Sequence, residues 1–137
     1  MFSSIVSRAS ALFLGVAGLG LLFASDSILP KLIAGSPPGA GVAGQLLAGA
    51  WLGVAALNWL SKSALIGGIY SRPVVSANAL LYFVAAMSLI KPLLRGDAPQ
   101  VLWLPFVPIA LFAAVYLWLL FRGPYQRDLE TFATKGP

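Results

Sequence analysis

The chain has 137 residues, of which 59% are hydrophobic and 9% are charged, and its formal net charge is +5. Soluble domains carry about 25% charged residues, so this composition excludes a water-soluble globule and favours a membrane protein. The chain has neither cysteine nor histidine, which excludes disulfides, thiolate nucleophiles and the metal or haem sites that need these ligands. We therefore expect no metal and no cofactor.

Four stretches without a charged residue follow one another along the chain. They cover 17, 30, 18 and 24 residues, in the order Ala9–Ser25, Leu32–Ser61, Pro73–Ile90 and Ala98–Phe121. The hydrocarbon core of a bilayer is about 30 Å thick, and about 20 apolar helical residues cross it. The pattern predicts an all-α integral membrane protein with four transmembrane helices in an antiparallel bundle. We expect helices near residues 5–24, 42–60, 74–90 and 101–121, within a single membrane domain of residues 1–137.

The first predicted helix also has features of a signal peptide. Arg8 precedes the apolar run Ala11–Phe23 as a basic region would. However, Leu22 or Phe23 would occupy the −3 position of a cleavage site, where a small residue is needed. We therefore expect an uncleaved first span.

The longest connection between predicted spans is Ser25–Gly41. Its Ser-Pro-Pro-Gly sequence at residues 36–39 cannot continue a helix. The apolar segment Ile28–Ile33 is expected to form a short helix or turn in the membrane interface. It is either a lid or partner-binding segment, or a connector that lies on the membrane.

Small residues recur at helical spacing in the first two predicted helices. Gly49 and Gly53 lie four residues apart in the second, and Gly15, Gly18 and Gly20 give the first a similar smooth stripe. Small residues let two helices approach closely in lipid, where no hydrophobic force drives them together. We expect these glycines to pack helices, either within the bundle, as between the first and second helices, or between protomers.

Two carboxamides are expected at similar depth on either side of the connection between the second and third helices. Asn58 lies four residues before Lys62, and Asn78 lies six residues after Arg72. An amide in hydrocarbon is costly unless it is hydrogen bonded. We expect the two to bond to each other, or to Ser61, Ser76 or nearby backbone carbonyls.

These asparagines also belong to a candidate binding site at the same turn. Arg72 has a planar fork of donors suited to phosphate or carboxylate, and basic pockets at the cytoplasmic ends of helices bind anionic lipid head groups. The candidate lipid or anion site comprises Asn58, Lys62, Tyr70, Arg72 and Asn78. The alternative is a hydrogen-bonded helical hairpin without a ligand, in which the basic residues at the turn only set the orientation in the membrane.

The nine basic residues lie mostly at the ends of the predicted spans and form no run. Such placement is typical of topology determinants, so we expect no nucleic-acid binding. Four spans put both termini on one side of the membrane. More lysine and arginine residues lie on that side than on the other, which predicts an N-in, C-in orientation. We expect the membrane to be the bacterial inner (plasma) membrane. The side of the termini carries Arg8, Lys62, Arg72, Arg122, Arg127 and Lys135, and the other side carries Lys31, Lys91 and Arg95.

The four charge-free stretches contain no Asp, Glu, Lys or Arg by definition, and all four acids of the chain lie outside the predicted spans, which argues against a proton-coupled pump. Asp97 with Lys91 and Arg95 is the only outer charged cluster, and its spacing indicates no catalytic site. We expect a non-catalytic structural or accessory subunit of a membrane complex, whose partners are membrane lipids and other membrane subunits or a second copy. The alternative is a small oligomeric transporter, channel or lipid- or anion-binding protein acting at the Asn58–Asn78 patch.

Overall fold

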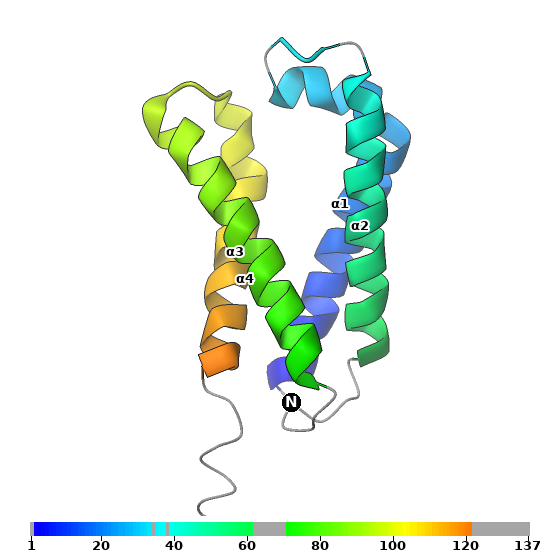
Figure 1. Cartoon of the computed structure of the whole chain (residues 1–137), viewed down its shortest axis with the longest axis vertical. Helices are drawn as coiled ribbons and strands as arrows, with labels where there is room; N and C mark the ends of the chain where they lie inside the picture. Colours follow the sequence, from blue (N-terminus) through cyan, green and yellow to red (C-terminus); the bar gives the residue numbers. More distant parts are fainter. Residues whose placement is uncertain (1, 34, 38, 62–70, 122–137) are drawn as a thin grey trace, which may run out of the picture.

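The structure is a computed structural model that describes residues 2–33, 35–37, 39–61 and 71–121. Within these residues all regular structure is helical, and four helices are long and apolar enough to cross a membrane. They are α1 (Phe2–Leu32), α2 (Ala40–Leu60), α3 (Ser71–Arg95) and α4 (Trp103–Phe121), with the short 3-10 helix η2 (Gln100–Leu102) directly before α4 (Figure 1). The expectation of an all-α chain with four helices of this kind is confirmed.

Helix α1 continues beyond the predicted end of the first span. Its backbone leaves helical geometry at Ala24 (φ −126°, ψ 20°), and a helix then resumes in a new direction as far as Leu32 (Figure 1). The prediction stopped at this point because Asp26 ends the charge-free run. A charge near a membrane surface does not end a helix, so residues 25–32 of the expected connection are helical. This includes most of the Ile28–Ile33 segment, which was expected to form a short helix or turn.

Helix α3 also extends past its predicted end, through Pro92 to Arg95. It is closed by Gly96, whose φ of 74° is the left-handed conformation that glycine adopts at low cost. The N–H of Gly96 donates to the carbonyl of Leu93 (3.3 Å), and the N–H of Asp97 donates to that of Pro92 (3.1 Å). This is the Schellman arrangement, so a glycine and not the first charge sets the end of the helix.

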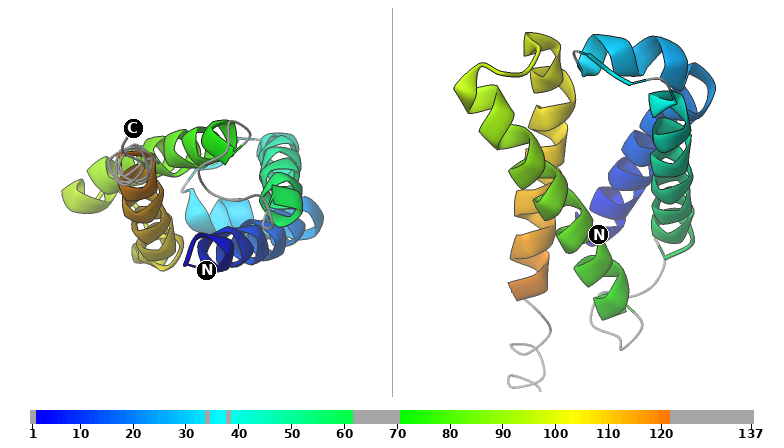
Figure 2. Two further views of the ribbon diagram at one scale, coloured as in Figure 1. Left: turned by 90° about the horizontal axis from the view of Figure 1, so that it is seen from below. Right: turned by 45° about the horizontal axis from the view of Figure 1, so that its top comes forward.

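The four helices form two pairs, α1 with α2 and α3 with α4 (Figures 1 and 2). In the view of Figure 1 the pairs meet in the lower half, near the N-terminus, and diverge toward the top. The buried core lies where they meet and includes Leu14, Tyr82, Ile109 and Tyr116. Many large apolar side chains point outward, such as Phe23 at 83% and Phe121 at 84% exposure, as expected for helices that face lipid.

Close approach of α1 and α2 depends on small residues. A Cβ placed on Gly18 would lie 3.0 Å from the Leu52 side chain, and one on Gly44 would lie 2.9 Å from the Cβ of Ser25. The expected contact between the first and second helices is therefore present. Gly18, one of the expected glycines, makes this contact together with Gly44, whereas at Gly15, Gly49 and Gly53 no atom of the described structure lies within 4 Å of such a Cβ.

Candidate functional site

Asn58 and Asn78 form a reciprocal hydrogen-bonded pair between α2 and α3. The Nδ2 of Asn58 donates to the Oδ1 of Asn78 at 2.8 Å, and the Nδ2 of Asn78 donates to the Oδ1 of Asn58 at 2.6 Å. Both residues are completely buried. The expected bonding of the two asparagines to each other is present, and it joins the two helix pairs.

Three further side chains complete this polar cluster. The second N–H of the Asn58 amide donates to the Oγ of Ser10 (3.0 Å), which shares a hydrogen bond with the hydroxyl of Tyr82 (2.7 Å). The Oγ of Ser7 donates to the backbone carbonyl of Asn58 (2.7 Å). We refer to Ser7, Ser10, Asn58, Asn78 and Tyr82 as the polar clamp, because these bonds tie α1, α2 and α3 together.

Helical spacing places these side chains on common faces. Ser7 and Ser10 are three residues apart in α1, and Asn78 and Tyr82 are four apart in α3, so each pair lies on one face of its helix. The remaining N–H of the Asn78 amide donates to the carbonyl of Val74, one turn earlier in α3 (2.8 Å). All four N–H groups and both oxygens of the two amides are therefore bonded.

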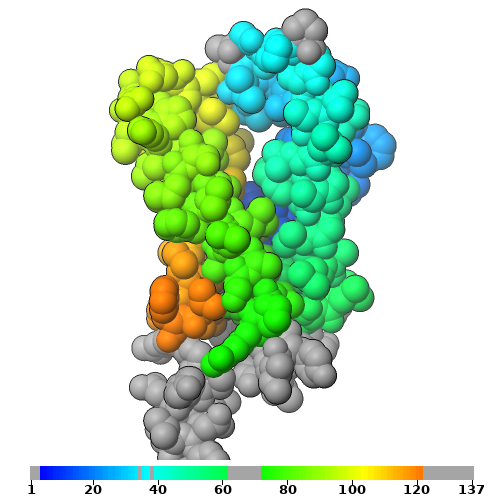
Figure 3. All heavy atoms as spheres, viewed as in Figure 1, coloured from blue at the N-terminus to red at the C-terminus, as the bar shows by residue number. Residues whose placement is uncertain are grey.

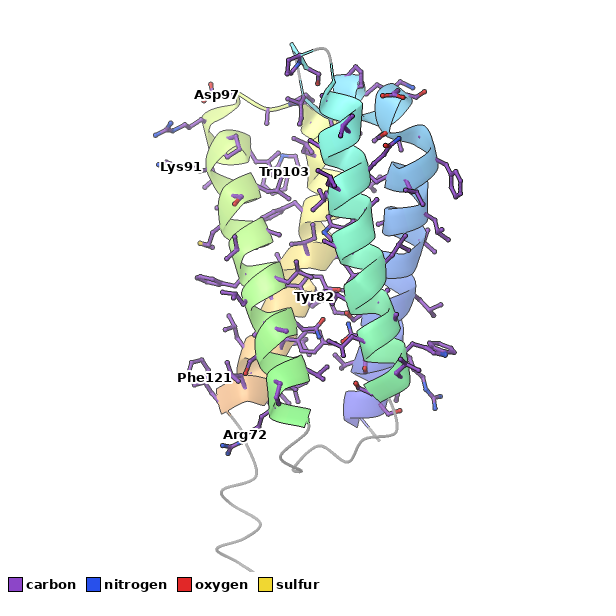
Figure 4. The ribbon with its side chains drawn as sticks, turned by 45° about the vertical axis from the view of Figure 1, so that its right-hand side comes forward. Arg72, Tyr82, Lys91, Asp97, Trp103 and Phe121 are labelled. Carbon is purple, nitrogen blue, oxygen red and sulfur yellow. The ribbon has the colours of Figure 1, made fainter. Side chains whose placement is uncertain are left out.

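An aromatic cluster packs beside the polar clamp and brings in α4. The rings of Tyr82 and Phe112 are stacked with centroids 5.0 Å apart, and those of Tyr82 and Tyr116 are stacked at 5.8 Å. Phe13 of α1 lies 5.7 Å from Phe112. Figure 4 shows Tyr82 in the interior between the helices. The aromatic cluster, Phe13, Tyr82, Phe112 and Tyr116, thus joins the same two helix pairs.

The hydroxyl oxygen of Tyr116 differs from the polar atoms of the clamp in its hydrogen bonding. The hydroxyl of Tyr116 is buried and has no hydrogen-bond partner among the described residues. A buried unpaired hydroxyl costs roughly 1–3 kcal/mol relative to its hydrated state. The ring stacking of Tyr116 on Tyr82 is the favourable interaction that the structure shows for this residue.

The other residues of the candidate lipid or anion site are not gathered around the asparagines. Arg72 is exposed at the start of α3 and points away from the helices in Figure 4. Lys62 and Tyr70 lie outside the described residues. The two amides use all their polar atoms within the polar clamp, so they can contact a ligand only if the clamp opens.

The polar clamp is made of hydroxyl and amide groups, and its hydrogen bonds join α1, α2 and α3. The described residues contain no group of three or more His, Cys, Asp or Glu that could hold a metal.

Ser7, Ser10 and Tyr82 were not predicted as members of this cluster. The two serines could have been identified from their spacing in an apolar helix, because a serine hydroxyl surrounded by apolar residues needs a hydrogen-bond partner. No protein-family model, no curated protein and no solved structure matches the chain.

Proposed function

We propose that this chain is a non-catalytic integral membrane protein that serves as a structural or accessory subunit of a membrane complex. In this proposal the four helices cross a bacterial inner membrane as an antiparallel bundle, with both termini on the cytoplasmic side. Four helices of suitable length and hydropathy support the insertion. The polar clamp supports a structural role, because its amides are bonded within the chain and none is left to bind a substrate.

The observation that supports the accessory role is an outward face of α2 that the described part of the chain leaves exposed. Gly49 and Gly53 are exposed there, with no described atom within 4 Å of an added Cβ. Leu46 (73%), Leu57 (40%) and Leu60 (80%) are exposed at helical spacing on the same face. We call these five residues the α2 outer face.

This face has the form of a helix-docking surface. Two glycines create a flat region between larger apolar side chains, so the backbone of another membrane helix can approach closely. Glycines allow such close packing within the chain as well, because Gly18 and Gly44 let α1 and α2 approach each other. The proposed occupant of the α2 outer face is a transmembrane helix of another subunit or of a second copy.

The test is native mass spectrometry of the full chain, extracted mildly from its own membrane. Gly49→Leu and Gly53→Leu are expected to remove a second polypeptide that binds the wild type in fixed stoichiometry. Ala114→Leu is the matched control, since it enlarges an exposed small residue on α4 and should leave the assembly intact. A wild type that is recovered only as a monomer, or equal recovery of the assembly from both glycine variants, would contradict the proposal.

The alternative proposal is a small transporter, channel or lipid- or anion-binding protein acting at the turn between α2 and α3. The exposed guanidinium of Arg72 is the described feature that favours it, since such a group binds phosphate well. If it is correct, Arg72→Ala releases a bound anionic lipid while the glycine variants keep it. Unchanged lipid retention by Arg72→Ala would argue against a site at this turn.

A further inference from the structure

The two helix pairs leave an opening between them in the upper half of the molecule. The space-filling view shows the surface hollowed between α3 and α2, above the level where the pairs touch (Figure 3). Figure 2 shows the same divergence from a second direction. The opening ends below at the aromatic cluster, where Phe13 and Phe112 lie 5.7 Å apart.

Sequence spacing identifies the walls of this opening. Gly20 follows Phe13 by seven residues, which is nearly two helical turns, so both lie on one face of α1 about 10 Å apart. Phe13 contacts the opposite pair, whereas a Cβ on Gly20 would have no described atom within 4 Å. From the same spacing we infer that Leu89, seven residues after Tyr82, and Pro105, seven before Phe112, lie across the opening. Both are half-buried, and Leu89 also packs against the buried core.

A segment of α1 closes the upper end. After the bend at Ala24, the helix runs across the top of the opening toward the start of α4 (Figures 1 and 2). Ser25 and Leu29 of this segment rest on Gly44 of α2, which fixes the segment at its base. With the top crossed by this segment and the bottom filled by aromatic rings, the opening is accessible from the side.

The charges around the upper end are mostly positive. Lys31 lies near the end of the crossing segment, and Lys91 and Arg95 lie at the end of α3. With Asp26 and Asp97, which also lie at this end, the formal net charge of these five residues is +1. No ion pair joins these charges within the described part of the chain. Lys91 points away from the α1–α2 pair in Figure 4, so Lys31, in the last turn of the crossing segment, is the basic residue that we expect to meet a phosphate at this opening.

We propose that the opening binds one acyl chain of an anionic phospholipid, whose phosphate group lies beside Lys31 at the upper end. Gly20, Leu89 and Pro105 offer an apolar wall without charge or amide. A chain from one leaflet reaches about half of the 30 Å hydrocarbon core and can therefore stop at the aromatic cluster. A partner helix has to cross the whole core, and the aromatic cluster and the crossing segment leave it no continuous path.

The inference rests on the proposed membrane insertion but not on the accessory role. The α2 outer face and the opening are separate surfaces, so loss of a partner subunit and loss of a lipid are distinguishable results. A lipid bound at the turn between α2 and α3 is distinguished by Arg72→Ala, which should not change retention of the lipid proposed here.

The experiment compares two glycine variants of the full chain purified in mild detergent. Gly20→Phe places a ring in the opening, whereas Gly15→Phe places one in open space at a position rotated by about 140° on the same helix. Native mass spectrometry after addition of phosphatidylglycerol should show one retained lipid in the wild type and in Gly15→Phe. Retention should fall at least five-fold in Gly20→Phe, and Lys31→Gln should reduce the preference over phosphatidylcholine.

A second measurement keeps the inference testable if Gly20→Phe does not fold. The wild-type protein is reconstituted with phosphatidylglycerol that carries a diazirine on its acyl chain, and the adducts are mapped. Adducts near Gly20 and Leu89 are expected. Adducts confined to outward positions such as Leu12 and Val16, equal lipid retention by both glycine variants, or a cross-linked polypeptide in the opening would each overturn the proposal.

Discussion

The asparagines of the polar clamp differ from the neighbouring Tyr116 in how completely their polar atoms are used. Asn58 and Asn78 are both fully buried, and every amide group has a partner. The hydroxyl of Tyr116 is also buried but has none among the described residues. Because a buried polar atom is costly only when unpaired, similar substitutions at these positions should have opposite consequences.

Replacing both asparagines should cost less stability than the sum of the two single replacements. Asn78→Leu leaves the Oδ1 of Asn58 without a donor, so we expect a loss of about 1–3 kcal/mol of stability. In Asn58→Leu/Asn78→Leu no amide remains unpaired, and the loss should be smaller than the sum of the two single losses. Unfolding in mixed micelles, followed by circular dichroism, measures these differences. Strict additivity would show that the pair is not energetically coupled.

The two stacked tyrosines provide a matched comparison of hydroxyls. Tyr82→Phe removes the hydrogen bond to Ser10 and should lower stability by about 1 kcal/mol. Tyr116→Phe removes only an unpaired buried hydroxyl and should be neutral or slightly stabilising. Both variants keep the stacked ring, so the same unfolding assay isolates the hydroxyl. A clear loss in Tyr116→Phe would reveal a partner for this hydroxyl in solution.

At the scale of the helices, two features set the shape of the upper half of the molecule: the bend in α1, and the packing of the α1 segment after the bend against α2. The segment after Ala24 packs on Gly44, where the approach leaves no room for a side chain: an added Cβ would lie 2.9 Å from the Cβ of Ser25. In contrast, Gly53 of the same helix has open space around it. Two glycines of one helix therefore have different structural roles.

Gly44→Leu should destabilise the contact between α1 and α2, whereas Gly53→Leu should not affect the monomer. Overpacking a tight contact costs about 1–3 kcal/mol, and an exposed helical glycine gains helix propensity when replaced. The free energy of unfolding of the monomeric protein in mixed micelles checks both expectations. Equal destabilisation by the two variants would place Gly53 in a tight contact and would remove the basis for the α2 outer face.

The central parts of the helices were predictable from sequence, but several helix ends and three of the five residues of the polar clamp were not. Long apolar runs identify membrane-length helices because the bilayer thickness alone sets their length. Asn58 and Asn78 were paired correctly because they flank one short connection and so lie at similar depth. Ser10 and Tyr82 are 72 residues apart, and their contact depends on how α1 and α3 meet, which a single sequence does not specify.

Across the whole molecule, the described charges gather at the two ends of the helices. Arg8 and Arg72 lie near the lower end of Figure 1, while the upper end carries Lys31, Lys91 and Arg95. Lys62, Arg122, Arg127 and Lys135, which give the predicted cytoplasmic side its excess, lie outside the described residues. The N-in, C-in orientation is a prediction from the charge distribution of the sequence alone.

Single cysteines can test this orientation directly, because the chain contains no cysteine of its own. Asp97 is exposed in the connection between α3 and η2 and points outward in Figure 4, and Ser63 lies in the connection between α2 and α3. Neither Asp97→Cys nor Ser63→Cys removes a lysine or arginine, so the charges that set the orientation are unchanged. A membrane-impermeant maleimide should label Asp97→Cys in intact cells and Ser63→Cys only after permeabilisation. The reverse pattern would invert the orientation, and labelling of both in intact cells would contradict four membrane spans.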